Sequence, residues 1–119
     1  FVILNDHTLA LGNLRSPHTL ANIRARPAVE VCFIDAVLRK AVRVAGSATL
    51  VNKRDAPALL RDALAGAWGS IHEHMTLYVR IDLTRAELIL SPAYDHGATE
   101  AELAEANMNK LAELYGRRT

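Results

Sequence analysis

Apolar and polar residues follow two different periods along this chain, and each period predicts a class of secondary structure. Two apolar runs, residues 1–4 and 8–11, flank a polar turn sequence and predict a β-hairpin. Four later segments have apolar residues at alternate positions or in short runs, as strands do: residues 29–34, 41–50, 75–83 and 87–91. The alternation is clearest over residues 75–83, which we expect to form a strand with one buried face.

Three other segments combine apolar residues at helical spacing with helix start or stop signals: residues 16–24, 57–67 and 99–116. Ser16 is a favourable N-cap for the first of these, and Asp55 is expected to cap the second. Thr99 begins the third, and Glu102, three residues later, completes a capping box. Gly46 lies inside a predicted strand, which indicates a bulge or the close approach of another backbone.

About six strands and three helices, with the strands joined mostly by short connections, predict an α+β fold that is mainly β. We expect an antiparallel barrel or curled sheet with the helices packed outside it. A length of 119 residues suits a single domain spanning residues 1–119. Because the chain begins with Phe1 inside an apolar run, we expect this domain to lack its N-terminal strand or helix.

The composition predicts a soluble globular protein, since half of the residues are apolar and just under a quarter are charged. No apolar run approaches the ~20 residues of a membrane-spanning helix. Cys32 is the single cysteine, so no internal disulfide can form, and a cytoplasmic location is expected. No basic residue adjoins Cys32 in the sequence, and we expect its thiol to be buried and inert.

Positive charge is concentrated in one part of the chain, although the net charge is only +1. Residues 13–54 contain eight Lys or Arg residues against two acidic residues, whereas residues 55–119 contain six against ten. The near-zero total argues against a general nucleic-acid-binding protein, which usually carries a broad basic surface. The local excess is typical of a site for a small anionic ligand.

Two neighbouring features could form such a site. The helix start at Ser16 offers free backbone N–H groups, the hydroxyls of Ser16 and Thr19, and the charge of Arg15. Arg43 alternates with valines on a predicted strand, and a guanidinium held there can bind a phosphate through two hydrogen bonds. The alternatives are a capped helix that binds nothing and a charge that protects an edge strand.

No recognised catalytic or metal motif is present. His72 and His74 would face the same way on a strand, but no cysteine or further histidine stands at ligand spacing, so no metal site is predicted. Residues 94–97 place an acid beside a histidine, and their composition favours a turn. The chain has no nucleophile elbow, Walker loop or dinucleotide glycine pattern.

Three pieces of the sequence resemble the pyridoxamine 5′-phosphate oxidase-like family of flavin-binding split β-barrels. They are LRSPHTLANIRARPAVEV, the pattern D-x-x-x-R-K-x-x-R-V-x-G, and LSPAYDHGATEAEL, in that order. The resemblance covers the chain from about Leu11 to Leu103. It implies an antiparallel split β-barrel, a homodimer, and FMN held in a cleft between the subunits. In such proteins the segment matching Ser16, His18 and Thr19 contacts the FMN phosphate, and the strand matching residues 40–43 lies near the flavin.

The candidate cofactor-binding residues come from the helix start and this strand: Asn13, Arg15, Ser16, His18, Thr19, Lys40 and Arg43. The expected function is an FMN-dependent oxidoreductase acting on a small molecule, with no nucleic-acid or membrane partner and no assigned catalytic side chain. One alternative cofactor is a deazaflavin, whose anionic tail needs the same basic cluster. Another alternative is a non-catalytic split barrel that binds a ligand or haem. His18, where many members carry lysine, and Ala41, where members often carry glycine, favour this second alternative.

Overall fold

The computed structural model describes residues 1–13 and 16–118. Its strands are β1 (Val2–Asn5), β2 (Thr8–Asn13), β3 (Ala28–Asp35), β4 (Lys40–Asn52) and β5 (Leu77–Leu90). Its α-helices are α1 (Pro17–Ala25), α2 (Ala58–Trp68) and α3 (Glu100–Arg118). Short 3₁₀ helices are η1 (Lys53–Asp55), η2 (Gly69–His74) and η3 (Pro92–His96). The predicted hairpin, the predicted helices and the predicted turn at residues 94–97 are therefore present.

The five strands form one antiparallel sheet in the order β1-β2-β5-β4-β3, which makes the fold α+β. Because β1 and β3 stay at the edges, the described strands form an open sheet rather than a closed barrel. The prediction of six strands is wrong, since the two strands predicted at residues 75–83 and 87–91 are replaced by one continuous strand, β5 (Leu77–Leu90). Hydrogen bonding maintains the strand where the apolar alternation fails, and the Thr84 hydroxyl donates to the Ala45 carbonyl at 3.2 Å.

The chain divides into two compact units. The first unit comprises Phe1–Glu30 and Val44–Arg85, and the second comprises Val31–Arg43 and Ala86–Thr119. Strands β3, β4 and β5 each contribute residues to both units.

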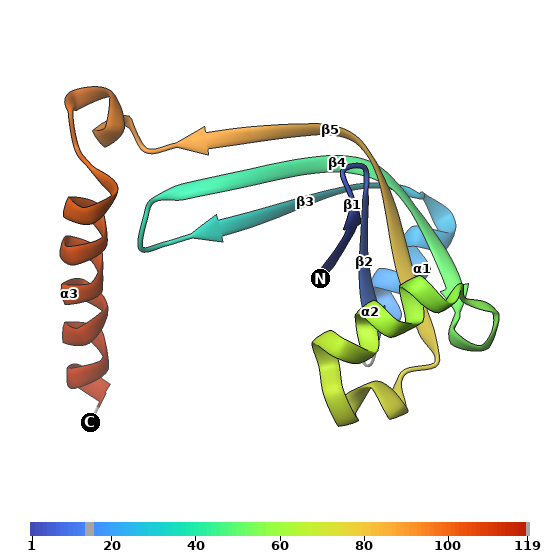
Figure 1. Cartoon of the computed structure of the whole chain (residues 1–119). Helices are drawn as coiled ribbons and strands as arrows, with labels where there is room; N and C mark the ends of the chain where they lie inside the picture. The colour runs from blue at the N-terminus through green and yellow to red at the C-terminus, as the bar shows by residue number, and fades with distance from the viewer. Residues whose placement is uncertain (14–15, 119) are drawn as a thin grey trace. The chain divides into compact units, whose positions relative to one another are not determined.

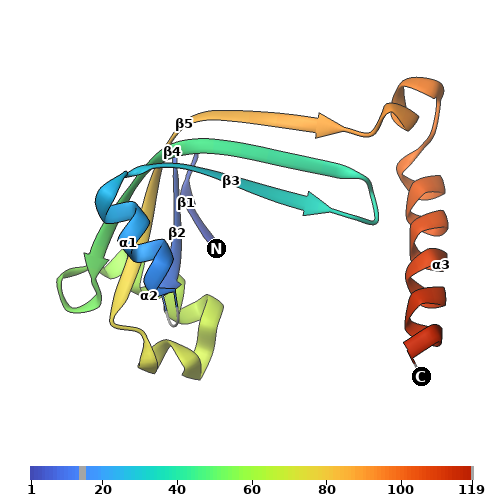
Figure 2. The same ribbon diagram turned by 180° about the vertical axis from the view of Figure 1, so that it is seen from behind.

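Two helices pack on the sheet of the first unit. Figure 1 shows α2 in front of the strands of this unit, and Figure 2, seen from behind, shows α1 in front of them. The core beneath α2 consists of buried residues from β2, β5, α2 and the segments flanking them: Ala10, Ala56, Leu60, Leu64, Met75 and Tyr78. Burial of such apolar side chains supplies most of the driving force for folding.

Strand β5 is buried on both faces in its first half, although the sequence predicts one buried face. Tyr78 is fully buried in the core beneath α2, while Val79 and Ile81 are buried on the opposite face. Side chains alternate across a strand, so a buried Tyr78 requires cover on the second face. The aromatic ring of Tyr78 packs in the core although its hydroxyl group is polar. The alternation of apolar residues therefore predicts less burial of β5 than the structure shows.

The helix starts agree only partly with the predicted caps. At α3, the Thr99 hydroxyl accepts a hydrogen bond from the Glu102 amide at 3.2 Å, which confirms Thr99 as the cap. At α2, the N-cap is Pro57, and Asp55 instead ends η1, so the prediction for Asp55 is wrong. At α1, Ser16 stands at the N-cap position, but its side chain makes no capping hydrogen bond.

Candidate functional site

The start of α1 lies in the first unit and carries three of the predicted site residues. Ser16 occupies the N-cap, and His18 and Thr19 in the first turn are exposed. Asn13 ends β2, directly before the loop that leads to this helix. Arg15 lies outside the described residues, so its predicted role is not assessed.

This helix start has unused hydrogen-bonding capacity within the described part of the chain. The Ser16 hydroxyl makes no capping bond, and Pro17 at the first helical position has no N–H group. The Ser16 carbonyl accepts from the Leu20 amide at 3.0 Å, which begins the helical ladder. The N–H groups of the first turn have no side-chain cap, and such groups with their helix dipole favour an anion.

Asn13, at the end of β2, carries a buried polar atom of its own. Its side-chain oxygen is buried and has no hydrogen-bond partner among the described residues. Leaving such an acceptor unpaired costs about 1–3 kcal/mol, so buried polar atoms usually find a partner. An unpaired acceptor accepts from a donor, such as a ligand hydroxyl or amide, and does not itself attract a phosphate.

Lys40 begins β4 in the second unit and is paired with a carboxylate that the sequence did not indicate. Its ammonium donates to Glu100 at the start of α3 and lies 5.2 Å from the centre of the Tyr94 ring. The Glu100 hydrogen bond raises the pKa of Lys40 above its ordinary value of 10.5. The ammonium is therefore charged at neutral pH, with Glu100 as its local counter-ion.

Arg43 also has a carboxylate partner. Its guanidinium donates to Glu87 of β5 at 2.5 Å, and both side chains are about half exposed. Arg43 is exposed, whereas the next residue along β4, Val44, is buried. An exposed ion pair of this kind contributes only about 0.2–1 kcal/mol, so an anionic ligand could replace Glu87 at modest cost.

The described residues of the predicted site thus divide between the two units as two sets. Asn13, Ser16, His18 and Thr19 belong to the first unit, and Lys40 and Arg43 belong to the second. Sequence reasoning missed the partners of the second set, Glu87 and Glu100. The acidic residues after position 54 are spread along the sequence, and nothing in their spacing identifies these two as the partners of Arg43 and Lys40.

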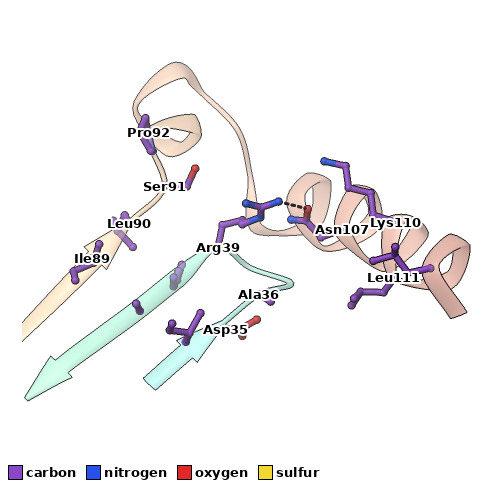
Figure 3. A pocket seen from close by; sticks show the side chains of 14 residues that line it. Asp35, Ala36, Arg39, Ile89, Leu90, Ser91, Pro92, Asn107, Lys110 and Leu111 are labelled. Carbon is purple, nitrogen blue, oxygen red and sulfur yellow. Dashed lines mark hydrogen bonds between the residues drawn. The ribbon is translucent and has the colours of Figure 1, made fainter. Parts of the chain in front are cut away.

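The second unit also has an open cavity of about 720 Å³, lined by residues of the β3–β4 turn, the end of β5 and α3 (Figure 3). Asn107 of α3 donates from its side-chain amide to the Val37 carbonyl at 2.8 Å and accepts from Arg39 at 3.4 Å. These bonds hold the helix against the turn. The signal for this contact was present in the sequence, because an asparagine interrupts the apolar positions 103, 111 and 114 of one helix face.

A second cavity, of about 490 Å³, lies in the first unit at the end of β4. Its lining includes three basic side chains, Lys53, Arg54 and Arg61. Lys53 donates to the His72 carbonyl at 2.9 Å, which ties the cavity wall to η2. Lys53 and Arg54 belong to the basic segment of residues 13–54 that the sequence shows. The sequence does not assign them to a binding site, and the structure places them in the lining of this cavity.

His72 and His74 lie in η2 and not on a strand. His72 is buried, and its Nε2 shares a hydrogen bond of 2.5 Å with the hydroxyl of Tyr78. Burial, together with the positive charges of Lys53 and Arg61, lowers the pKa of His72 below its ordinary value of 6.5. Burial likewise raises the pKa of Tyr78 above 10.0. The pair is neutral at pH 7 and serves the core of the first unit.

Three further observations limit the chemistry of the described residues. They contain no group of three or more His, Cys, Asp or Glu side chains placed to hold a metal ion. Cys32 is exposed, so the prediction of a buried thiol is wrong; it lies on β3, an edge strand with a neighbour on one side only. None of the described helices combines the length and apolar character needed to cross a membrane.

Comparisons of the chain with protein-family models, with curated proteins and with solved structures found no match.

Proposed function

We propose that this protein is an FMN-dependent oxidoreductase with a split β-barrel fold, related to the pyridoxamine 5′-phosphate oxidase-like family. The observation that carries the proposal is the start of α1, where Ser16 stands at the N-cap and its side chain makes no capping hydrogen bond. A helix start with free amides and a free hydroxyl suits a phosphate group. The expected substrate is a small molecule, and the expected location is the cytoplasm.

The described residues fit a phosphate-bearing flavin in part. Ser16, His18 and Thr19 would hold the phosphate, with the first-turn amides of α1 as further donors. The buried oxygen of Asn13 would accept from a hydroxyl of the flavin side chain. Lys40 and Arg43 fit less directly, because each already has a carboxylate partner.

When bound, FMN would supply the hydride-transfer chemistry, and the protein would bind and orient the ring system. Because the cofactor would carry the redox chemistry, no acid–base role is assigned to a side chain. A deazaflavin with an anionic tail would use the same contacts at Ser16 and Thr19. Titration with both cofactors would separate these two possibilities.

Because the Ser16 side chain makes no capping hydrogen bond, replacing it should affect stability and FMN binding differently. Ser16→Ala should lower the free energy of unfolding by less than about 0.5 kcal/mol, because no capping bond is lost. The same variant should weaken FMN binding by about tenfold, which is the value of one hydrogen bond to a charged group. Fluorescence titration and urea denaturation measure the two effects.

Thr99→Ala is the matched control for Ser16→Ala. Thr99 does cap its helix, so its loss should cost about 1 kcal/mol of stability and leave FMN affinity unchanged. If Ser16→Ala instead destabilises the protein as Thr99→Ala does, with no change in FMN binding, Ser16 is a structural cap and the phosphate role is wrong.

We further propose that the protein is a homodimer with the flavin cleft at the subunit interface. The support is apolar surface on strands of the second unit outside its cavity, since Leu88 is 63% exposed and Val42 is 38% exposed. Exposed apolar side chains of this kind are typical of subunit interfaces. Light scattering should give twice the chain mass, and Leu88→Glu should shift it toward the monomer; a monomeric wild-type protein contradicts the proposal.

One observation favours a second candidate, a split-barrel module that binds a ligand without redox chemistry. Both strand cations assigned to the flavin, Lys40 and Arg43, are paired with carboxylates. Such pairs orient side chains but reduce the positive charge available to a phosphate. A colourless native protein that takes up neither FMN nor a deazaflavin would support this candidate over the oxidoreductase.

A further inference from the structure

The open cavity of the second unit combines an apolar wall with unbalanced positive charge. The wall is aliphatic and comes from the end of β3, the end of β5 and α3: Ile34, Ile89, Leu90, Leu111 and Leu114. None of the described residues that line it is aromatic. Its volume of about 720 Å³ lies within the range of about 300–1,000 Å³ that is usual for small-molecule sites.

Three cations and one carboxylate line the cavity. Lys40 is paired with Glu100, while the Asp35 carboxylate accepts from the Val37 and Leu38 amides, each at 2.9 Å, and keeps its negative charge. Arg39 and Lys110 together outnumber that one carboxylate, so the charge that a ligand would meet is positive. Throughout residues 1–13 and 16–118, the Lys110 ammonium has no hydrogen bond or ion pair, and the Arg39 guanidinium has only its 3.4 Å bond to Asn107.

These two cations come from different elements but belong to one site. Figure 3 shows the Arg39 side chain reaching from the turn to Asn107, with Lys110 and Leu111 on the following turn of α3. Asn107, Lys110 and Leu111 lie three and four residues apart, so they share one helix face. The Asn107 bonds thereby place a charged end and an aliphatic wall in the same cavity.

The backbone of Arg39 is a second, independent observation. Its φ of 56° lies in the left-handed region that favours glycine, and it is the only described residue other than glycine with a positive φ. A glycine would make this turn without strain. Strained backbone is concentrated at functional sites, which supports a role for the guanidinium beyond the turn.

We propose that the second-unit cavity binds an aliphatic carboxylate, with its carboxylate at Arg39 and Lys110 and its chain on the wall formed by β3, β5 and α3. A guanidinium and an ammonium together favour a carboxylate over a neutral head group. The aliphatic wall favours an alkyl chain over an aromatic ring, which has no stacking partner here. This proposal is independent of flavin binding.

Calorimetric titration of the full chain with decanoate tests the proposal, with decanol as the neutral analogue. We expect decanoate to bind at least about tenfold more tightly than decanol. Lys110→Met and Arg39→Gly should each weaken decanoate by about tenfold and leave decanol unchanged. Equal affinities for the two ligands, or no decanoate binding, would overturn the proposal.

The variants have built-in controls. Arg39→Gly should fold with an undiminished melting temperature, because glycine adopts the positive φ of this turn. If Arg39→Gly fails to fold, Arg39→Gln provides the binding measurement. Arg54→Met, an exposed cation of the first unit, should bind decanoate like the wild type. If decanoate does not bind and Leu114→Glu dissociates a dimer, a second copy covers the cavity and the proposal is wrong.

Discussion

Replacing Gly46 with alanine should lower the free energy of unfolding by about 3 kcal/mol or more, the upper part of the range for overpacking. A Cβ atom at this position would lie 2.3 Å from the carbonyl oxygen of Asp82 and 3.0 Å from the Cα of Leu83. Both neighbours are backbone atoms, so no flexible side chain can move aside. The strands β4 and β5 would have to separate locally. Urea denaturation measures the loss.

Two other glycines provide a graded comparison for Gly46. Gly66 lies inside α2 with nothing within 4 Å of its added Cβ, so Gly66→Ala should stabilise the protein by up to about 1 kcal/mol. At Gly12 the added Cβ would meet the Met75 sulfur at 2.2 Å, but this neighbour is a flexible side chain. We therefore expect Gly12→Ala to cost less than Gly46→Ala. If Gly46→Ala were as stable as the wild type, the close approach of β4 and β5 would be wrong.

Tyr78→Phe should lower the free energy of unfolding by about 1–3 kcal/mol, although it removes one oxygen atom only. The hydroxyl of Tyr78 is the hydrogen-bond partner of His72 Nε2, and both residues are buried. Without it, a polar nitrogen stays in the core with no partner, and it keeps the full cost of leaving water. Thermal and urea denaturation measure the loss.

The same pair sets the pH dependence of stability. The pKa of His72 is lowered in the folded state, so the unfolded chain binds the proton more readily. The stability that depends on neutral His72 is therefore complete above pH 6.5 and is lost as the pH falls through the folded pKa. The pKa of Tyr78 is raised, so its contribution is complete below pH 10.0 and is lost as the pH rises further.

Denaturation at pH 5, 7 and 9, values chosen around the ordinary pKa of His72, tests this dependence. We expect the wild type to lose stability between pH 7 and pH 5, and His72→Gln to lose much less over the same interval. His74→Gln is the matched control, because His74 lies in the same 3₁₀ helix but is exposed. If His74→Gln removes the acid-side loss and His72→Gln does not, the assignment to the buried pair is wrong.

The local elements could be predicted where the signal was itself local. The hairpin of β1 and β2 and the capped start of α3 at Thr99 depend on turn and capping residues a few positions apart. Gly46 also gave a correct signal, because the structure places another backbone against it. In contrast, the continuity of β5 depends on neighbouring strands, which supply hydrogen bonds where the apolar pattern is interrupted.

The site could be predicted less completely than the fold, because its contacts join residues far apart in the sequence. The sequence identified Lys40 and Arg43 as cations, but not their partners Glu100 and Glu87. The cavity beside Arg39 depends on Asn107 meeting the β3–β4 turn, a contact across 68 residues. No local pattern encodes such a pairing, and an asparagine within an apolar helix face was its only trace.

Comparing the affinities of the full chain for FMN and for riboflavin tests the flavin proposal most directly, because the two ligands differ only by the phosphate. With a phosphate held at the start of α1, we expect FMN to bind at least about tenfold more tightly than riboflavin, and Ser16→Ala to reduce this difference. Equal affinities for the two ligands, or binding of neither by the folded protein, would contradict a phosphate site at Ser16.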